Sequence, residues 1–234
     1  MVCMSGPRHI AIILDGNRRY AASRGKLPWQ GHHDGRKNVE KLLGWAKERN
    51  IKELTLYAFS LQNFQRPDDE VRELFLLLKS ACDQFLSKDF EDKHKIRIQF
   101  IGRTHLFPDD IQEKMLQVEN ATAHHQEYLL NFCVAYGGRE EIVDAVKVLA
   151  KKIVDGSLHP DEITEEVLGS ELWLKSEPDM IIRTSGEQRL SNFLLWQGNY
   201  AELFFVDKHW PEFTEKDFQM CIDQYDSRQR RFGQ

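Results

Sequence analysis

The stretch that decides the fold is His9-Ile10-Ala11-Ile12-Ile13-Leu14-Asp15-Gly16-Asn17. Residues 10–14 are all apolar, which is typical of a short strand that is buried on both faces. The Asp-Gly-Asn that follows predicts a tight turn at the carboxyl end of that strand. We therefore expect residues 9–14 to form a buried strand that ends in a polar loop.

The same pattern recurs along the chain. Further apolar segments predict strands at residues 53–60, 96–101, 129–136, 180–184 and 203–206. Helical patterns separate most of them: one has Val39, Leu42, Leu43 and Ala46 on one face, one runs from a capping Asp68 to Leu86, and one carries Ile142, Val143, Val146 and Leu149. This alternation predicts an α/β fold, with a single domain over residues 1–234 and a mainly parallel, six-stranded sheet surrounded by helices.

Composition and charge exclude some functional classes without naming one. The formal net charge of -5 disfavours a nucleic-acid partner, which would need a dominant basic field. The four cysteines are scattered, so we expect reduced thiols rather than a zinc site. The start of the sequence lacks the pattern of a secretory signal, and the densest apolar run, residues 74–78, is far shorter than the ~20 residues that span a bilayer. We expect a cytoplasmic protein that can still contact a membrane surface.

Polar and basic residues gather where the predicted strands end. Three strands run into sets of such residues: Asp15, Gly16, Asn17, Arg18 and Arg19; Ser60, Asn63 and Arg66; and Arg183, Gly186, Arg189 and Ser191. In a parallel sheet these ends share one edge, where ligands bind. A guanidinium donates two parallel hydrogen bonds to phosphate oxygens, and glycines let backbone amides approach an anion. The pattern predicts a phosphate site, although any one of these arginines could instead pair with a surface carboxylate.

Asp15 is the first candidate metal ligand at this edge. A carboxylate beside two arginines can neutralise them, but at a phosphate site it can also hold Mg2+, which takes oxygen ligands and bridges substrate phosphates. The chain has neither a G-x-x-x-x-G-K-[ST] loop nor a G-x-G-x-x-G turn after the first strand, which argues against nucleoside triphosphate chemistry. Two acidic pairs, at residues 68–69 and 109–110, follow prolines at predicted helix starts, where capping explains them.

Taken in order, these motifs resemble those of the cis-prenyltransferases, the undecaprenyl diphosphate synthase group. The resemblance covers nearly the whole chain and rests on residues 9–21 (HIAIILDGNRRYA), Gly31-His32 with Gly35, Tyr57-Ala58-Phe59-Ser60 with Asn63, Arg66 and Pro67, Tyr136-Gly137-Gly138-Arg139, and residues 182–197 (IRTSGEQRLSNFLLWQ) continuing to Tyr200-Ala201-Glu202. It implies a magnesium-dependent transferase that condenses isopentenyl diphosphate with an allylic prenyl diphosphate to give a cis-polyprenyl diphosphate. It also implies a homodimer and two diphosphate pockets beside a hydrophobic tunnel.

The resemblance further implies roles for individual residues. The allylic diphosphate is expected to contact Gly16, Asn17, Arg18, Arg19 and His32, and isopentenyl diphosphate to contact Arg183, Arg189 and Ser191. Asp15 would engage Mg2+ and Glu202 would complete the metal site, while Ser60, Asn63 and Arg66 would lie near the reacting carbons. His32 would protonate or orient the departing diphosphate. Arg231 and Gly233 belong to a C-terminal R-x-G element that would reach the neighbouring subunit's active site, and the bulk of Phe75, Leu78 or Phe85 would limit product length.

Some positions depart from the commonest pattern of this family. Pro28 stands where an arginine often binds the allylic diphosphate, and Leu61 and Gln62 stand where a small residue and a glutamate are usual. Arg18 replaces a common glycine and can compensate for Pro28. The primer, the product length and the acceptor therefore stay open, including a non-standard acceptor or a short product. The alternatives are a non-catalytic partner subunit, which the motif aspartate and arginines disfavour, and a phosphate-sensing or nucleotide-binding module.

Overall fold

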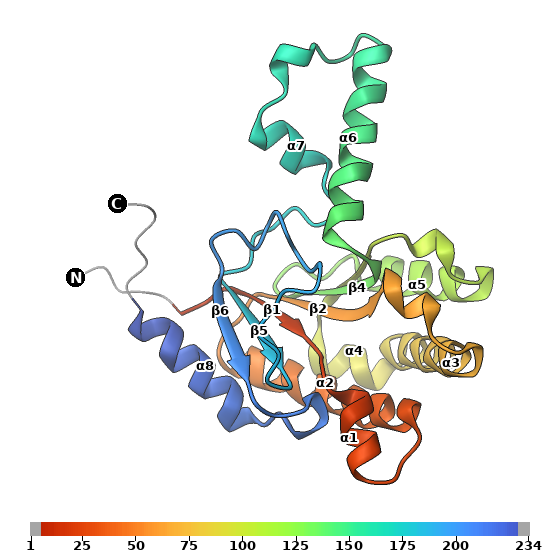
Figure 1. Ribbon diagram of the computed structural model, residues 1–234, viewed down its shortest axis with the longest axis vertical. Helices are drawn as coiled ribbons and strands as arrows, with labels where there is room; N and C mark the ends of the chain where they lie inside the picture. The colour runs from red at the N-terminus through yellow and green to blue at the C-terminus, as the bar shows by residue number, and fades with distance from the viewer. Residues whose placement is uncertain (1–5, 229–234) are drawn as a thin grey trace.

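The computed structural model describes residues 6–228 and is built around one parallel sheet (Figure 1). The six strands are β1 (His9–Ile13), β2 (Glu53–Ser60), β3 (Arg97–Ile101), β4 (Leu129–Tyr136), β5 (Met180–Thr184) and β6 (Glu202–Val206). Their order is β3-β4-β2-β1-β5-β6, and every neighbouring pair is parallel. The predicted α/β fold is confirmed, and each predicted strand agrees with the observed one to within one residue at either end.

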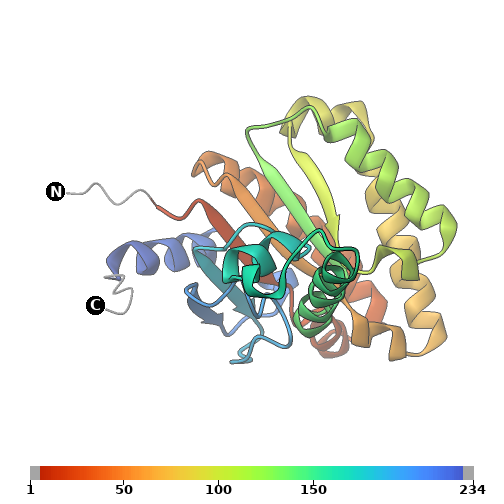
Figure 2. The same ribbon diagram turned by 90° about the horizontal axis from the view of Figure 1, so that it is seen from above.

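Helices connect most of the parallel strands, but the link from β5 to β6 contains none. They are α1 (Asn17–Ser23), α2 (Pro28–Glu48), α3 (Asp68–Phe85), α4 (Lys88–His94), α5 (Asp109–Thr122), α6 (Gly138–Val154), α7 (Glu165–Glu171) and α8 (Glu215–Ser227), with short 3-10 turns at Leu61–Gln65 (η1), Thr104–Leu106 (η2), Pro160–Glu162 (η3) and Trp210–Glu212 (η4). Figure 1 shows α6 and α7 projecting from the sheet and the other helices, and Figure 2 views the molecule from above, nearly along α6. Within residues 6–228, no helix combines the length and the apolar character needed to cross a membrane.

The two faces of the sheet are covered in different ways. On β1, Ile10 and Ile12 belong to a large apolar core formed with α2, α3, α5 and α8. Ala11 and Ile13 face a smaller cluster that includes Leu174 and Phe193, from the segments on either side of β5. Because both faces are covered, the chain needs an uninterrupted apolar strand at this position, which explains the continuous run in the sequence.

One detail of the predicted helices is wrong, and one helix buries a face that the sequence pattern did not indicate. Asp68 does not cap α3: it is the first helical residue, Pro67 holds the cap position, and no side chain makes a capping hydrogen bond. In α6, Val143 and Val146 are half exposed, while Glu141, Ala145 and Leu149 are buried. The buried stripe of α6 therefore follows a spacing of four residues that includes a glutamate, which an apolar pattern could not reveal.

Candidate active site

A buried arginine joins three segments at the carboxyl edge of the sheet. Arg183 lies on β5 opposite Ile13 of β1 and is only 4% exposed. Its Nη2 donates to Asp15 Oδ2 at 2.8 Å, and its Nη1 donates to Ser191 Oγ at 2.7 Å and to the carbonyl of Arg189. The predicted residues Asp15, Arg183 and Ser191 are therefore in contact.

The same arrangement fixes the charge of Asp15. Burial alone would raise the pKa of its carboxyl group, but hydrogen bonds and positive charge from Arg183 and Arg19 outweigh burial and hold the pKa below its ordinary range. Arg19 Nη2 donates to Asp15 Oδ1 at 3.1 Å. The result is a carboxylate that stays ionised at neutral pH, with both oxygens directed at the arginines.

The turn after β1 requires a glycine. Gly16 has φ +100°, and a Cβ there would lie 2.7 Å from both Ser185 Oγ and His209 Nδ1. The next residue, Asn17, begins α1 and donates from Nδ2 to the carbonyl of Leu14 at 3.0 Å. These contacts hold the loop close to the end of β5, where Arg183 lies.

A second ion-pair chain crosses the rim of the site. Arg19 Nη1 donates to Glu187 Oε1 at 2.9 Å, and Arg189 pairs with the other oxygen of Glu187. Arg19 and Arg189 thus both pair with a carboxylate, which is the alternative that the sequence left open for these arginines. The side chains of Arg19 and Arg189 are 46% and 61% exposed, so an incoming anion can replace Glu187 as their partner. Sequence reasoning had assigned Glu187 no role.

His32 and Arg66 meet on the other side of Asp15. Arg66 Nη1 lies 3.4 Å from His32 Nε2 and donates to Glu70 Oε1 at 2.9 Å. Glu70 is buried and also lies 3.4 Å from Arg18 Nε. Burial, together with the positive charges of Arg66 and Arg18, lowers the pKa of His32 to about 3. His32 is therefore a neutral ring before any diphosphate binds, and Glu70 is a second anchoring carboxylate that sequence reasoning missed.

A recess of about 480 Å³ lies at this point. Its lining comes from the turn after β1, from α1, from the first turns of α2 and from the end of η1: Leu14, Asp15, Gly16, Asn17, Arg18, Arg19, Ala22, Pro28, His32 and Arg66. Pro28 and Arg18 line the same recess. Arg18 of α1 thus supplies an arginine to the recess in which Pro28 replaces the arginine that is common in the family.

Next to the recess, a cavity of about 300 Å³ runs from polar residues into an apolar end. Its polar lining consists of Asp15, Asn17, His32, Arg36, Tyr57, Ser60, Asn63, Arg66 and Arg183. Ser60 and Asn63 are linked by a 2.9 Å hydrogen bond from the Ser60 amide to Asn63 Oδ1, which fixes the turn into η1. The predicted residues at the end of β2 thus share one cavity with Asp15 and Arg183.

Aromatic rings close the apolar end of this cavity. Phe85 stacks against Phe132 with ring centroids 5.4 Å apart, and Phe132 stacks against Phe100 at 5.8 Å. Leu78 and Phe85 line the cavity as the length-limiting hypothesis requires. Phe75 does not line it and packs against Phe107 instead, with centroids 5.3 Å apart.

Glu202 and the C-terminal residues lie apart from this group. Glu202 is the first residue of β6. In the sheet it lies opposite Met180 of β5, which lies opposite Ile10 of β1. Ile10 is five residues before Asp15, so Glu202 lies towards the other end of the strands. At ~3.3 Å per residue the backbones of the two residues are offset by about 16 Å along the strand direction. Glu202 pairs with Arg228 instead, and one chain alone does not bring it to Asp15. Arg231 and Gly233 fall outside the described residues.

Comparisons with known proteins agree with this geometry. Residues 13–233 match the family model described as "Putative undecaprenyl diphosphate synthase". A tritrans,polycis-undecaprenyl-diphosphate synthase (geranylgeranyl-diphosphate specific) from Pyrococcus abyssi is 44% identical over 229 residues, which cover 97% of this chain and 87% of the relative. The enzyme of the same name from Methanocaldococcus jannaschii is 41% identical over 231 residues, which cover 97% of this chain and 82% of the relative.

Solved structures match over the whole described fold. Lavandulyl diphosphate synthase from Lavandula x intermedia, in complex with dimethylallyl diphosphate, has a TM-score of 0.91 and 35% identity, covering 98% of this chain and 99% of that one. A probable undecaprenyl diphosphate synthase from Campylobacter jejuni has a TM-score of 0.81 and 35% identity, covering 99% of this chain and 100% of that one. At 35% identity over nearly the whole chain, both matches extend to the sequence as well as to the fold. This chain therefore belongs to the undecaprenyl diphosphate synthase family of cis-prenyltransferases.

Proposed function

We propose that this cis-prenyltransferase extends geranylgeranyl diphosphate with isopentenyl diphosphate to a long cis-polyprenyl diphosphate. One observation carries the proposal: a single cavity joins an arginine-rich mouth to an apolar end closed by aromatic rings. That combination suits a substrate with a diphosphate head and a hydrocarbon tail. The choice of primer follows the names of the curated relatives.

The two diphosphates would bind on either side of Asp15. The recess beside Arg18, Arg19, His32 and Arg66 would hold the allylic diphosphate, and Arg183 with Arg189 and Ser191 would hold isopentenyl diphosphate. The neutral ring of His32 would accept or donate one hydrogen bond and orient the leaving group. A bound diphosphate would stabilise the protonated ring and so raise the pKa of His32. His32 could therefore donate a proton only after the diphosphate has bound.

The residues present fit a magnesium ion. Mg2+ usually takes one or two protein carboxylates together with substrate phosphate oxygens, and Asp15 is an ionised carboxylate beside the recess. Its two oxygens offer about four lone-pair sites, so Asp15 can keep its contacts with Arg183 and Arg19 and still bind a cation. When bound, the ion would stabilise negative charge on the departing diphosphate. Glu202 would take part only from a second copy of the chain.

The chain's own residues would mainly position the two substrates and stabilise the charges that develop during the reaction. As the allylic carbon–oxygen bond breaks, negative charge grows on the diphosphate, where Arg18, Arg19 and Arg66 lie. The alkene of isopentenyl diphosphate would then form the new carbon–carbon bond and lose a proton, which leaves a cis double bond. Ser60 and Asn63 would contact the reacting end of the cavity, and the apolar wall would exclude water from the cationic carbon.

We also propose a homodimer formed through α6. Val143 and Val146 on this projecting helix are about half exposed (Figure 1), and an apolar helix face that is directed outward usually marks an interface. Val146→Glu should shift the protein from dimer to monomer in analytical ultracentrifugation, while Lys147→Glu, next to it, should not. A wild-type monomer would overturn this part of the proposal. Because the product is a long hydrocarbon, peripheral contact with a membrane during release is part of the same proposal.

A second candidate function is the synthesis of a short product. The higher structural similarity to lavandulyl diphosphate synthase favours it, as does the aromatic closure of the cavity. The deciding experiment measures kcat/KM for dimethylallyl, geranyl, farnesyl and geranylgeranyl diphosphates with labelled isopentenyl diphosphate, and resolves the products by length. The main proposal predicts the highest kcat/KM for geranylgeranyl diphosphate and long products. Preference for dimethylallyl diphosphate with short products would replace it by the second, and Asp15→Asn should abolish either activity.

A further inference from the structure

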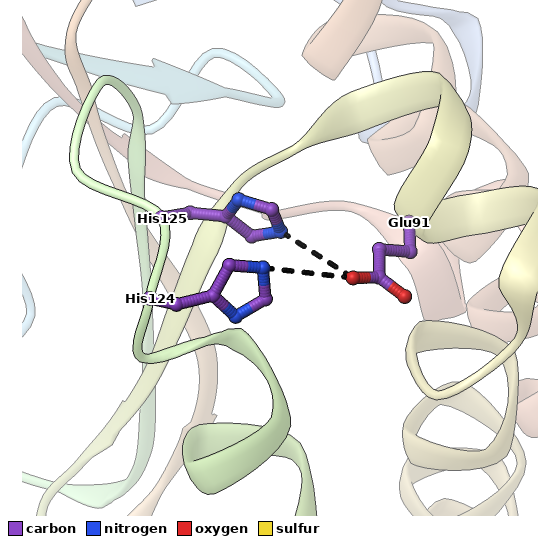
Figure 3. A group of neighbouring side chains, drawn as sticks. All are labelled: Glu91, His124 and His125. Carbon is purple, nitrogen blue, oxygen red and sulfur yellow. Dashed lines mark ion pairs between the residues drawn. The ribbon is translucent and has the colours of Figure 1, made fainter.

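Figure 3 shows three potential metal ligands, Glu91, His124 and His125, directed toward one another. They precede β3 and β4, whereas the active site lies where the strands end. Glu91 lies on α4, which leads into the amino end of β3, and His124 and His125 follow α5 in the turn that leads towards β4. Nε2 of His124 lies 3.6 Å from Glu91 Oε1, and Nε2 of His125 lies 4.0 Å from the same oxygen. One ligand atom from each residue lies within 4.8 Å of the others.

This donor set differs in kind from the oxygen site at Asp15. Two imidazoles and one carboxylate are ligands that zinc uses in proteins, often with water in the fourth position. Around a tetrahedral ion with bonds of ~2.0–2.1 Å, ligand atoms lie roughly 3.3 Å apart. The two distances from Glu91 Oε1 to the histidine nitrogens would have to close by less than about 1 Å. The side chains of Glu91 and His124 are 52% and 59% exposed and can rotate.

His125 gives a second, independent observation. Its side chain is only 13% exposed, and its buried Nε2 has no hydrogen-bond partner among residues 6–228. A buried polar atom without a partner costs free energy unless a ligand satisfies it.

We propose that Glu91, His124 and His125 bind one divalent cation of the zinc class, at a site separate from the catalytic centre. The bound ion would tie α4 to the connection between α5 and β4. This matters for the hydrocarbon pocket, because α4 directly follows α3, and Phe90 of α4 packs against the cavity-lining Phe85 with ring centroids 5.0 Å apart. The ion would therefore hold the closed end of the cavity in place.

The test measures binding directly. Untagged protein carrying Cys3→Ser, which removes the one cysteine outside the described residues, is dialysed against Zn2+ with excess Mg2+ present to occupy the oxygen site. We expect one zinc ion per chain and a higher melting temperature with zinc. With Co2+ in place of zinc, we expect the visible absorption of a tetrahedral ion with nitrogen and oxygen ligands. Glu91→Gln and His125→Gln should each lower the affinity at least about tenfold, because each removes one of three ligands.

A matched control uses another surface histidine beside a carboxylate. His159 Nδ1 lies 3.4 Å from Asp161 without a second histidine, so His159→Gln should leave the zinc stoichiometry and affinity unchanged. The proposal is overturned if wild-type protein binds no zinc under these conditions, or if Glu91→Gln and His125→Gln bind it as tightly as wild type. Either result would leave the catalytic proposal untouched, because its substrates and its magnesium ion bind at the other edge of the sheet.

Discussion

The substitution Glu70→Gln tests the least visible part of the active site. Glu70 lies in the first turn of α3, is buried, and accepts a hydrogen bond from Arg66 at 2.9 Å while facing Arg18 at 3.4 Å. Glutamine keeps the shape and removes the charge. The substitution therefore leaves two arginines near each other and near His32 without the carboxylate that holds them.

The expected loss of stability depends on how deeply the ion pairs of Glu70 are buried. Breaking a fully buried ion pair costs about 3–5 kcal/mol, but the side chains of Arg66 and Arg18 are 21% and 52% exposed, so solvent recovers part of the loss and we expect about 1–3 kcal/mol. In a chain of this size each kcal/mol lowers the melting temperature by about 2–4 °C. Because Arg66 is then free to move, KM for the allylic diphosphate should rise about tenfold, which corresponds to roughly 1.4 kcal/mol.

Urea unfolding and steady-state kinetics measure the two effects separately. Asp69→Asn is the matched control: it is exposed, lies one residue earlier in the same helical turn, and removes the same favourable charge from the helix start. If Glu70→Gln and Asp69→Asn have equal stabilities and equal KM values, the assignment of Glu70 as the residue that positions Arg66 is wrong. A loss of stability with an unchanged KM would assign Glu70 to the fold alone.

Three further predictions concern the mouth and the closed end of the cavity. Arg183→Lys should lower kcat/KM at least about hundredfold with an unchanged circular dichroism spectrum, because a single ammonium nitrogen lacks the planar fork from which Arg183 donates to Ser191 and Asp15 through two separate nitrogens; wild-type kinetics would contradict this. The pKa of Asp15 lies below its ordinary value of 3.8, so its stabilisation is complete above that pH and is lost as the pH falls through the lowered pKa. Urea unfolding between pH 2 and 5 should therefore show a larger loss of stability in wild type than in Asp15→Asn, and equal losses would contradict this. Phe85→Ala should lengthen the products and cost about 3 kcal/mol, whereas Phe218→Ala, also buried but outside the cavity lining, should cost about as much and leave product length unchanged; equal product lengths in these two variants would refute Phe85 as the limit.

The strands could be predicted from the sequence because the sheet is covered on both faces. A short, continuous apolar run bounded by a turn, such as residues 10–14, indicates a strand that is buried on both faces. Because the strands are parallel, their polar carboxyl ends then lie at one edge of the sheet. That is why Asp15, Ser60, Asn63, Arg66 and Arg183 could be grouped before any coordinates were known.

The parts that could not be predicted depend on pairing across the fold. Glu70 and Glu187 each pair with an arginine of α1 that is distant in sequence, Arg18 and Arg19 respectively. An acidic residue near a helix start gives the same sequence pattern whether it faces solvent or an arginine. Glu202 was placed at the metal by resemblance alone, whereas the strand register puts it at the opposite edge in one chain. Phe75 and Phe85 share one helix, and only the packing of the surrounding rings separates the one that lines the cavity.

The most direct test of the proposed function is the structure of the product itself. Geranylgeranyl diphosphate and carbon-13-labelled isopentenyl diphosphate are incubated with the protein and Mg2+, and the extracted product is examined by mass spectrometry and NMR. The proposal predicts a series of five-carbon additions, each with one new cis double bond, and no such series with Asp15→Asn. Binding of both diphosphates without elongation, or elongation with trans double bonds, would contradict it.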